Sequence, residues 1–177
     1  MSLTAHTYSI PSFESERLLL RPFQQADFEA MARFFADPVS QFYGGPCSRE
    51  DAWRKMAVYA GHWLLHGYGP WALEEKASGQ FVGLSGPWFP EGWPEPEITW
   101  ALLPEHHGKG YATEAARRAL QAAYEYCGWT TAISVVATGN VASRAVAERL
   151  GAQLEATMPF RGGEGWRFRH LSPAMLR

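Results

Sequence analysis

A short turn with two glycines joins an apolar segment to an alanine-rich one, in the sequence His107-Gly108-Lys109-Gly110-Tyr111-Ala112. The preceding segment, Glu97 to Leu103, is mostly apolar and ends at Pro104, which predicts a strand. The following segment, Thr113 to Cys127, repeats small or apolar residues at helical spacing. Glycines let the backbone turn sharply and leave its N–H groups uncovered, and the first turn of a helix has unpaired N–H groups at its positive dipole end. The turn therefore predicts an anion site, and a pyrophosphate is its natural occupant.

Two common nucleotide motifs do not fit this turn. A phosphate-binding P-loop requires a Ser or Thr directly after Gly-Lys, and this sequence has none at that place. A dinucleotide fold requires a third glycine, whereas Gly108 and Gly110 are followed by Ala112 and Thr113. A glycine turn that binds no ligand is the structural alternative.

A second motif lies about 30 residues later, after a short apolar segment at 132–136 that predicts a strand. There Asn140 is a candidate helix N-cap, Ser143 follows in the first turn, and Gly151 is placed as a C-terminal cap. These residues alone predict only a short helix. Their order and their distance from the glycine turn, however, suggest that the two motifs belong to one binding site.

The two motifs together resemble the coenzyme-binding elements of the GNAT superfamily of N-acetyltransferases. The acetyl-coenzyme A loop of that family, Gln/Arg-x-x-Gly-x-Gly/Ala, corresponds to His107-x-x-Gly110-x-Ala112, with His107 as a departure from the usual Gln or Arg. The second family element, Asn-x-x-Ser/Ala before a short helix, corresponds to Asn140 and Ser143. The opening Glu16 to Phe23 is similar to the branch that acetylates the N-termini of ribosomal proteins. The resemblance spans about residues 14–172.

The resemblance implies a single N-acetyltransferase domain over residues 1–177, of the α/β (α+β) class, with a mixed, mostly antiparallel sheet flanked by helices. Periodicity alone gives only a mixed sheet with helices. The expected element order is β-α-α-β-β-β-α-β-α-β-β, with residues 1–13 as a loosely packed N-terminal extension. The second helix, capped by Ser48, is expected to bury one stripe of side chains, formed by Trp53, Met56, Ala57, Ala60, Trp63 and Leu64.

The resemblance also implies acetyl-coenzyme A as co-substrate and an acyl transfer to an amine. An alkyl ammonium must lose a proton before it attacks, so the reaction needs a general base. Glu97 is the candidate base, with Glu95 and Glu91 as fallbacks, and apolar neighbours would raise the pKa of a buried glutamate. Many family members place a tyrosine where this chain has Ala147, so Ser143 is the candidate that assists the leaving thiolate. Candidate coenzyme contacts, including backbone N–H groups for the thioester carbonyl, are Ala101, Leu102, Leu103, His107, Gly108, Lys109, Gly110, Tyr111, Ala112, Thr113, Asn140 and Ser143.

The acceptor is the part of the function that the sequence describes least. Aromatic residues in two loops, Phe42, Tyr43, Trp88 and Trp93, are candidate walls of an acceptor site. A protein or peptide N-terminus is the preferred acceptor, because an α-amino group loses its proton more easily than a lysine or polyamine nitrogen. A small amine such as a polyamine or an antibiotic, and a non-catalytic acyl-coenzyme A-binding domain, remain as alternatives.

Composition excludes several other classes. The net charge of −2 argues against direct nucleic-acid binding, and the sequence has no apolar run long enough to span a membrane. Two cysteines without ligand spacing, and histidines without it, predict neither a disulfide framework nor a metal site. We therefore expect a cytoplasmic protein, either a monomer or a homodimer.

Overall fold

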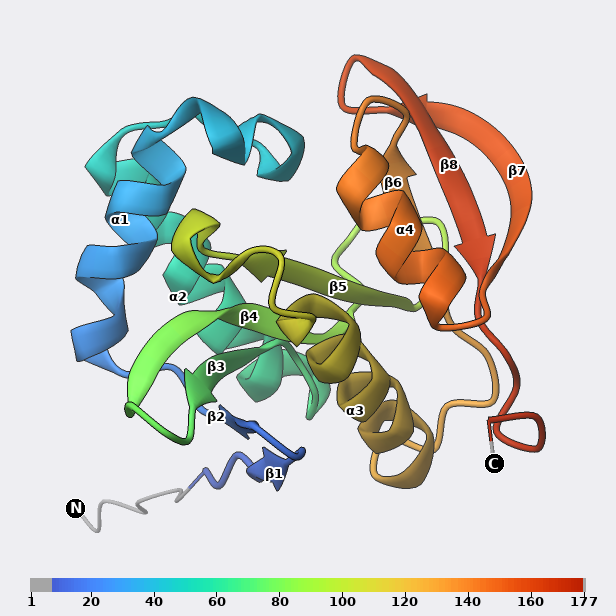
Figure 1. Ribbon diagram of the computed structural model, residues 1–177, viewed down its shortest axis with the longest axis horizontal. Helices are drawn as coiled ribbons and strands as arrows, with labels where there is room; N and C mark the ends of the chain where they lie inside the picture. Colours follow the sequence, from blue (N-terminus) through green and yellow to red (C-terminus); the bar gives the residue numbers. More distant parts are fainter. Residues whose placement is uncertain (1–7, 177) are drawn as a thin grey trace, which may run out of the picture.

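The computed structural model describes residues 8–176, and these form one mixed sheet with helices on both faces (Figure 1). The strands lie in the order β1-β2-β3-β4-β5-β6-β8-β7. Each neighbouring pair is antiparallel except β5 and β6, which run parallel. The strand bounds are Phe13–Glu14 for β1, Leu18–Arg21 for β2, Trp71–Glu75 for β3, Gln80–Trp88 for β4, Glu97–Leu102 for β5, Ile133–Ala137 for β6, Gln153–Phe160 for β7 and Gly163–Arg169 for β8.

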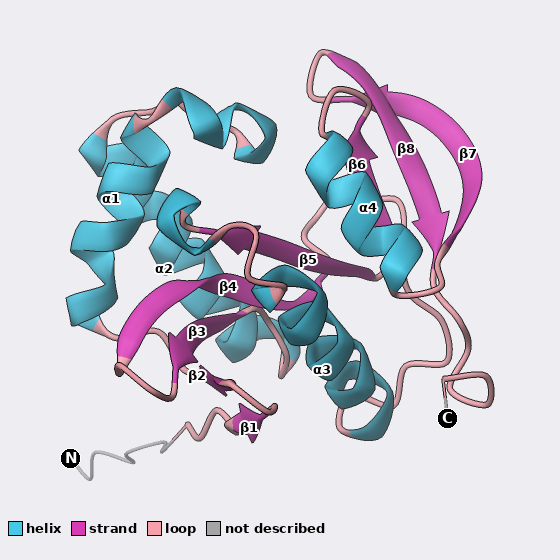
Figure 2. Ribbon diagram, in the orientation of Figure 1, coloured by secondary structure: helices cyan, strands magenta, loops and turns pink. Residues whose placement is uncertain are grey.

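Four α-helices connect these strands (Figure 2). The expected order of helices and strands is confirmed, with the two-residue β1 and three short 3-10 turns in addition. The predicted caps are present: Ser48 accepts a hydrogen bond from the Asp51 N–H, and Asn140 accepts one from the Ser143 N–H. The helix bounds are Phe28–Ala36 for α1, Arg49–His66 for α2, Tyr111–Glu125 for α3 and Val141–Arg149 for α4.

The helices divide the core into two apolar clusters on opposite faces of the sheet. One cluster joins α3 to Ile98, Trp100 and Leu102 of β5, and its α3 face consists mainly of fully buried alanines. Small side chains let this helix lie close to the sheet. The other cluster joins α1 and α2 to Ala101 and Leu103. The predicted alternation along β5 is therefore confirmed, and it directs Glu97 and Thr99 to the face that α1 and α2 cover.

The predicted stripe on α2 is wrong in part. Met56 and Trp63 are buried, but Trp53 and Leu64 are exposed, as are Ala57 and Ala60. The buried face of this helix instead contains two residues outside the predicted stripe, Ala52 and His62. The helix carries apolar residues nearly all round, so periodicity alone did not identify its inner face.

Most of the expected N-terminal extension, residues 1–7, lies outside the described residues. Its last part is attached to the body of the protein rather than loosely packed. The indole N–H of Trp71 donates to the Pro11 carbonyl at 2.8 Å, and the Tyr8 hydroxyl donates to the Trp63 carbonyl. Phe13 then pairs with Leu20 as β1 joins the sheet edge.

The two parallel strands β5 and β6 separate soon after they meet. They share one paired position, Glu97 with Ile133, and then diverge, with α3 and α4 on the same side of the opening (Figure 1). Because the strands separate here, the backbone groups of β5 beyond Ile98 have no strand partner on that side. The candidate site lies at this opening.

None of the helices in residues 8–176 is long and apolar enough to cross a membrane.

Candidate active site

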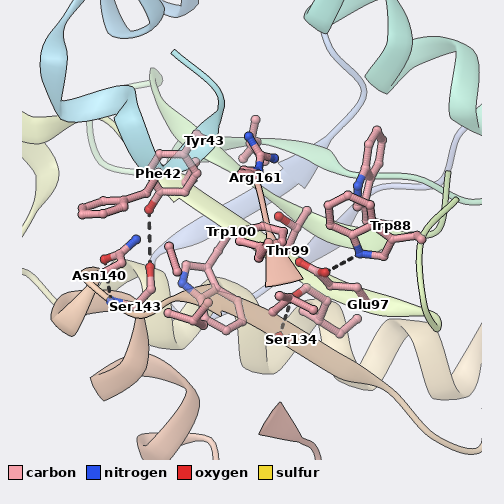
Figure 3. Close-up of a pocket in the computed structure, with 18 of the residues that line it drawn as sticks. Phe42, Tyr43, Trp88, Glu97, Thr99, Trp100, Ser134, Asn140, Ser143 and Arg161 are labelled. Atoms are coloured by element: carbon pink, nitrogen blue, oxygen red, sulfur yellow. Dashed lines mark hydrogen bonds between the residues drawn. The ribbon is translucent and has the colours of Figure 1, made fainter. Parts of the chain in front are cut away.

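A pocket lies where β5 and β6 diverge, and both strands, α4 and three loops contribute to its wall (Figure 3). It brings together residues far apart in the sequence, and its cavity volume is about 70 Å³. Eight predicted site residues line it: Phe42, Tyr43, Trp88, Trp93, Glu97, Ala101, Asn140 and Ser143.

Glu97 is a buried carboxyl group in this pocket, with a relative exposure of 5%. Burial raises its pKa to about 8, because water no longer solvates the charged form. Three neighbours oppose that shift: the indole N–H of Trp93, which donates to the carboxyl, the Val135 backbone N–H and the charge of Arg161. The expected rise in the pKa of Glu97 is therefore present. The alternative, in which Glu97 lies in water at the edge of the strand, does not hold.

The fallback carboxylates are less suited to take up a proton. Glu95 forms a two-pronged ion pair with Arg169 at 2.7 and 2.9 Å, and these hydrogen bonds lower its pKa. Glu91 is exposed in the β4–β5 loop and does not line the pocket. Of these three glutamates, Glu97 is the one that both lines the pocket and has a raised pKa.

The edge of β5 at the opening presents fewer free N–H groups than we expected. The Leu103 N–H donates to the Val82 carbonyl at 2.9 Å, and Ala101 pairs with Leu84 of β4, so neither faces the opening. Backbone groups alternate along a strand, and the N–H of Leu102 therefore points to the open side. Of the N–H groups around Ala101 to Leu103 that we expect to hold a thioester carbonyl, the Leu102 N–H is therefore the one that faces the opening.

Two hydroxyl groups meet at the N-terminus of α4. Asn140 holds the Ser143 N–H at 3.1 Å, and the Ser143 hydroxyl lies 3.5 Å from the Tyr43 hydroxyl (Figure 3). Tyr43, predicted only as an acceptor contact, thus lies beside the serine predicted to assist the thiolate. Ala147, one turn further along α4, is fully buried and has no polar atom to offer.

The glycine turn forms a separate part of the site at the start of α3. Gly108 and Gly110 have φ values of 75° and 82°, the left-handed region that favours glycine. Within the described chain, no backbone hydrogen bond is formed by the N–H groups of residues 108–113; the first in the helix is from Glu114 to Gly110. These N–H groups and the helix dipole fit the diphosphate of a coenzyme.

Side chains of the turn contact the protein and leave those N–H groups uncovered. The His107 ring donates to the Leu102 carbonyl at 2.9 Å, and the Tyr111 hydroxyl donates to Glu75. Arg17 braces the turn by donating to the Lys109 carbonyl at 3.0 Å. His107 therefore fixes the turn to β5, which accounts for a residue that differs from the usual Gln or Arg.

Sequence reasoning missed several pocket residues. Arg161 and Phe160 come from the β7–β8 hairpin, Tyr59 from α2 and Ser134 from β6. Arg161-Gly162 is recognisable as a two-residue turn, but no sequence signal places its tip over a pocket formed by other strands. Among residues 8–176, no cluster of three or more His, Cys, Asp or Glu side chains is arranged to hold a metal ion.

The fold and the site together define an α/β protein with a glycine turn at the start of α3 and a pocket where β5 and β6 diverge. Comparison with known proteins agrees. The family model described as an acetyltransferase (GNAT) domain matches residues 17–153. The chain belongs to the GNAT acetyltransferase family, and its single α/β fold is that of the family.

Solved structures give the same result. An acetyltransferase from Agrobacterium tumefaciens is 34% identical, with a TM-score of 0.85 over 96% of this chain and 99% of that one. A putative ribosomal-protein-serine acetyltransferase from Vibrio cholerae is 19% identical, with a TM-score of 0.75 over 95% of this chain and all of that one. Spermidine N-acetyltransferase from Vibrio cholerae, in complex with CoA and spermine, is 18% identical, with a TM-score of 0.73 over 90% and 98%. The last two share the fold only, so they do not distinguish between acceptors.

Proposed function

We propose that this protein transfers an acetyl group from acetyl-coenzyme A directly to the α-amino group of an acceptor. The observation that carries the proposal is the buried Glu97, with its raised pKa, in one pocket with Asn140 and Ser143. Acetyl transfer is the activity of the family, and the acceptor is the part that we infer.

The free thiols of Cys47 and Cys127 fit a reducing cytoplasm.

Acetyl-coenzyme A, when bound, supplies an acyl group activated as a thioester. The N–H groups of residues 108–113 would hold its diphosphate, and the opening between β5 and β6 would lead from there to the pocket. At that opening the Leu102 N–H is placed to donate to a carbonyl oxygen as negative charge develops on it.

Glu97 acts on the acceptor. In its ionised form it takes a proton from the ammonium, which leaves a neutral amine able to attack. A carboxylate with a pKa of about 8 is a stronger base than an ordinary glutamate, and it is well matched to an α-ammonium with a pKa near 8. Lysine and polyamine nitrogens, with pKa values about two units higher, are harder for the same base to deprotonate.

Ser143 and Tyr43 act on the leaving group. A departing thiolate needs a hydrogen bond or a proton, and the two hydroxyl groups lie 3.5 Å apart at the N-terminus of α4. Tyr43 then does part of the work for which many family members use a residue at the position of Ala147. The helix dipole of α4 also favours negative charge at this end.

Among α-amines, a protein or peptide N-terminus and a free small molecule both remain candidates. The aromatic walls Phe42, Tyr43, Trp88 and Trp93 would contact either of them. The pocket is partly closed by the β7–β8 hairpin, since Phe160 packs on Trp93 with ring centroids 5.9 Å apart. This contact favours an acceptor of which only a small part enters.

The test is release of free thiol from acetyl-coenzyme A across a panel of amino acids, N-terminal peptides, spermidine and an aminoglycoside. Glu97→Gln keeps the shape of the side chain but not its basicity, so we expect a loss in kcat of about 10²–10⁴-fold with normal coenzyme binding. The residual rate should recover as pH rises and free amine becomes abundant.

Glu91→Gln is the matched control, because it removes an exposed carboxylate from the loop that precedes β5. It should leave kcat within about twofold. If Glu97→Gln also stays within about twofold at pH 7, Glu97 is not the base. Faster turnover of spermidine or the aminoglycoside than of any α-amine would instead overturn the acceptor proposal.

A further inference from the structure

The tip of the β7–β8 hairpin carries an arginine over the mouth of the acceptor pocket. Arg161 is the first residue of the two-residue turn between Phe160 and Gly163, and its guanidinium lies 5.2 Å from the centre of the Phe160 ring. The side chain lines the pocket together with Tyr43 and Thr99 (Figure 3).

Lys55 of α2 is not itself a lining residue of the pocket, but it approaches the Arg161 guanidinium beside Gly44. A β-carbon built on Gly44 would lie 2.4 Å from a terminal nitrogen of Arg161 and 3.1 Å from the Lys55 ammonium nitrogen. Two atoms at those distances from one point are at most 5.5 Å apart. Lys55 is held in position by Phe35, whose ring centre is 5.2 Å from its ammonium. The two cations therefore converge beside the residue that follows Tyr43.

The carboxylates nearest in charge to these two cations do not pair with them directly: the charge of Arg161 acts on Glu97, and that of Lys55 acts on Asp51. Within residues 8–176, Arg161 and Lys55 form no ion pair, and the nearest acidic neighbour on α2, Asp51, is already bonded to Arg54 at 2.6 Å. Like charges at this separation repel each other, and an anion between them would remove the repulsion. Arginine and lysine are also the usual partners of carboxylates and phosphates.

The backbone conformation of Arg161 also indicates that this residue has a function. Its φ is 49°, and it is the one non-glycine residue with positive φ in the described chain. Asn, Asp or Gly are the residues that such a turn normally contains. An arginine is less favourable there for the fold, and such sites are often functional.

We propose that Arg161 and Lys55 form an anion subsite of the acceptor pocket, and that the acceptor is a small amine bearing a carboxylate, an amino acid in the first instance. The inference rests on the proposed acetyl transfer and specifies its substrate. The amine enters toward Glu97, while the carboxylate stays at the mouth between the two cations. A polyamine, which carries only positive charge, is disfavoured by the same two residues.

The experiment compares phenylalanine, phenylalaninamide, an N-terminal phenylalanine peptide with an amidated C-terminus, phosphoethanolamine and spermidine. We expect kcat/KM for phenylalanine to exceed that for its amide by about 10–100-fold, as loss of a charge-assisted contact implies. Phosphoethanolamine distinguishes a phosphate from a carboxylate as the preferred anion: turnover above that of phenylalanine would overturn the carboxylate assignment.

Arg161→Asn is the decisive variant, because asparagine accepts a positive φ and should keep or raise the melting temperature. It should raise KM for phenylalanine about tenfold or more and leave KM for the amide and for acetyl-coenzyme A within about twofold. Lys55→Met, which keeps the apolar stem, should act in the same direction. Arg33→Gln, an exposed arginine on α1 without an ion pair in residues 8–176, is the control and should change nothing.

Binding of phenylalanine, followed by quenching of the pocket tryptophans, separates this inference from the function on which it rests. Binding that depends on Arg161, with no thiol released from any amine, would support the subsite and overturn acetyl transfer. Thiol release that is equal for phenylalanine, its amide and the amidated peptide, and is unchanged in Arg161→Asn, would overturn the subsite and leave acetyl transfer standing.

Discussion

At the scale of single residues, Glu97 shows most clearly how burial changes the ionisation of a side chain. Its pKa is raised to about 8 by burial, from an ordinary value near 4.5. The folded protein therefore favours the protonated form. The stabilisation that goes with this proton is complete below pH 4.5 and is lost as pH rises through about 8.

A stability measurement tests this without any substrate. Glu97→Gln cannot ionise, so its melting temperature should resemble that of the wild type near pH 5 and exceed it at pH 9. The difference in unfolding free energy should reach several kcal/mol at most, at about 1.4 kcal/mol for each unit of pKa shift. Curves that stay parallel from pH 5 to 9 would show that the Glu97 carboxyl is not buried as described.

Glu95→Gln gives the opposite sign and serves as its control. Hydrogen bonds from Arg169 lower the pKa of Glu95, so its ion pair stabilises the fold at neutral pH and is lost as pH falls through that lowered pKa. Since Glu95 is partly exposed, the effect of the substitution should be small. It should lower the melting temperature at pH 7 and have little effect at the acid end.

At the scale of elements, the conformation of the glycine turn before α3 follows directly from the sequence, and its predicted role in coenzyme binding can be tested. Glycine is required by the positive φ of Gly110, and a β-carbon there would meet only Arg17, at 3.5 Å. Gly110→Val should therefore fold with some strain, while its side chain lies among N–H groups that would bind phosphate. We expect affinity for acetyl-coenzyme A, measured by calorimetry, to fall at least tenfold.

Gly128→Val separates strain from binding. Gly128 also has positive φ, at 69°, and a β-carbon there has no neighbour within 4 Å, in the loop after α3. The two substitutions impose a similar backbone penalty, so their melting temperatures should fall alike. Equal coenzyme affinity in both variants would remove the phosphate role of the turn.

Elements differ in how far their sequences reveal them. The order of helices and strands, the alternation along β5 and the caps Ser48 and Asn140 follow from local patterns, and these predictions were correct. The inner face of α2 did not follow, because that helix has aromatic and apolar residues on several sides. The meeting of Tyr43 with Ser143, and of Arg161 with Lys55, depends on how distant segments pack. Local pattern carries no information on such contacts.

At the scale of the whole molecule, the site lies between two parts of the sheet that are weakly joined. β1 to β5 form one part and β6 to β8 the other, with a single paired position between β5 and β6. The glycine turn and Glu97 belong to the first part, whereas Asn140, Ser143 and Arg161 belong to the second. A coenzyme in the opening would contact both parts and so restrain their separation.

Acetyl-coenzyme A should therefore stabilise the fold and protect the edges of β5 and β6. At about 100 times its dissociation constant, a ligand that binds only the folded state adds about 2.7 kcal/mol, or about 5–10 °C in melting temperature for a chain of this size. Hydrogen exchange should slow at Leu102 and along β6, where the strands diverge, and much less in β2 and β3. Pantetheine, which lacks the diphosphate, should give a far smaller shift, and so should the coenzyme with Gly110→Val. Protection confined to the start of α3, with β5 and β6 unchanged, would mean that the coenzyme does not enter the opening.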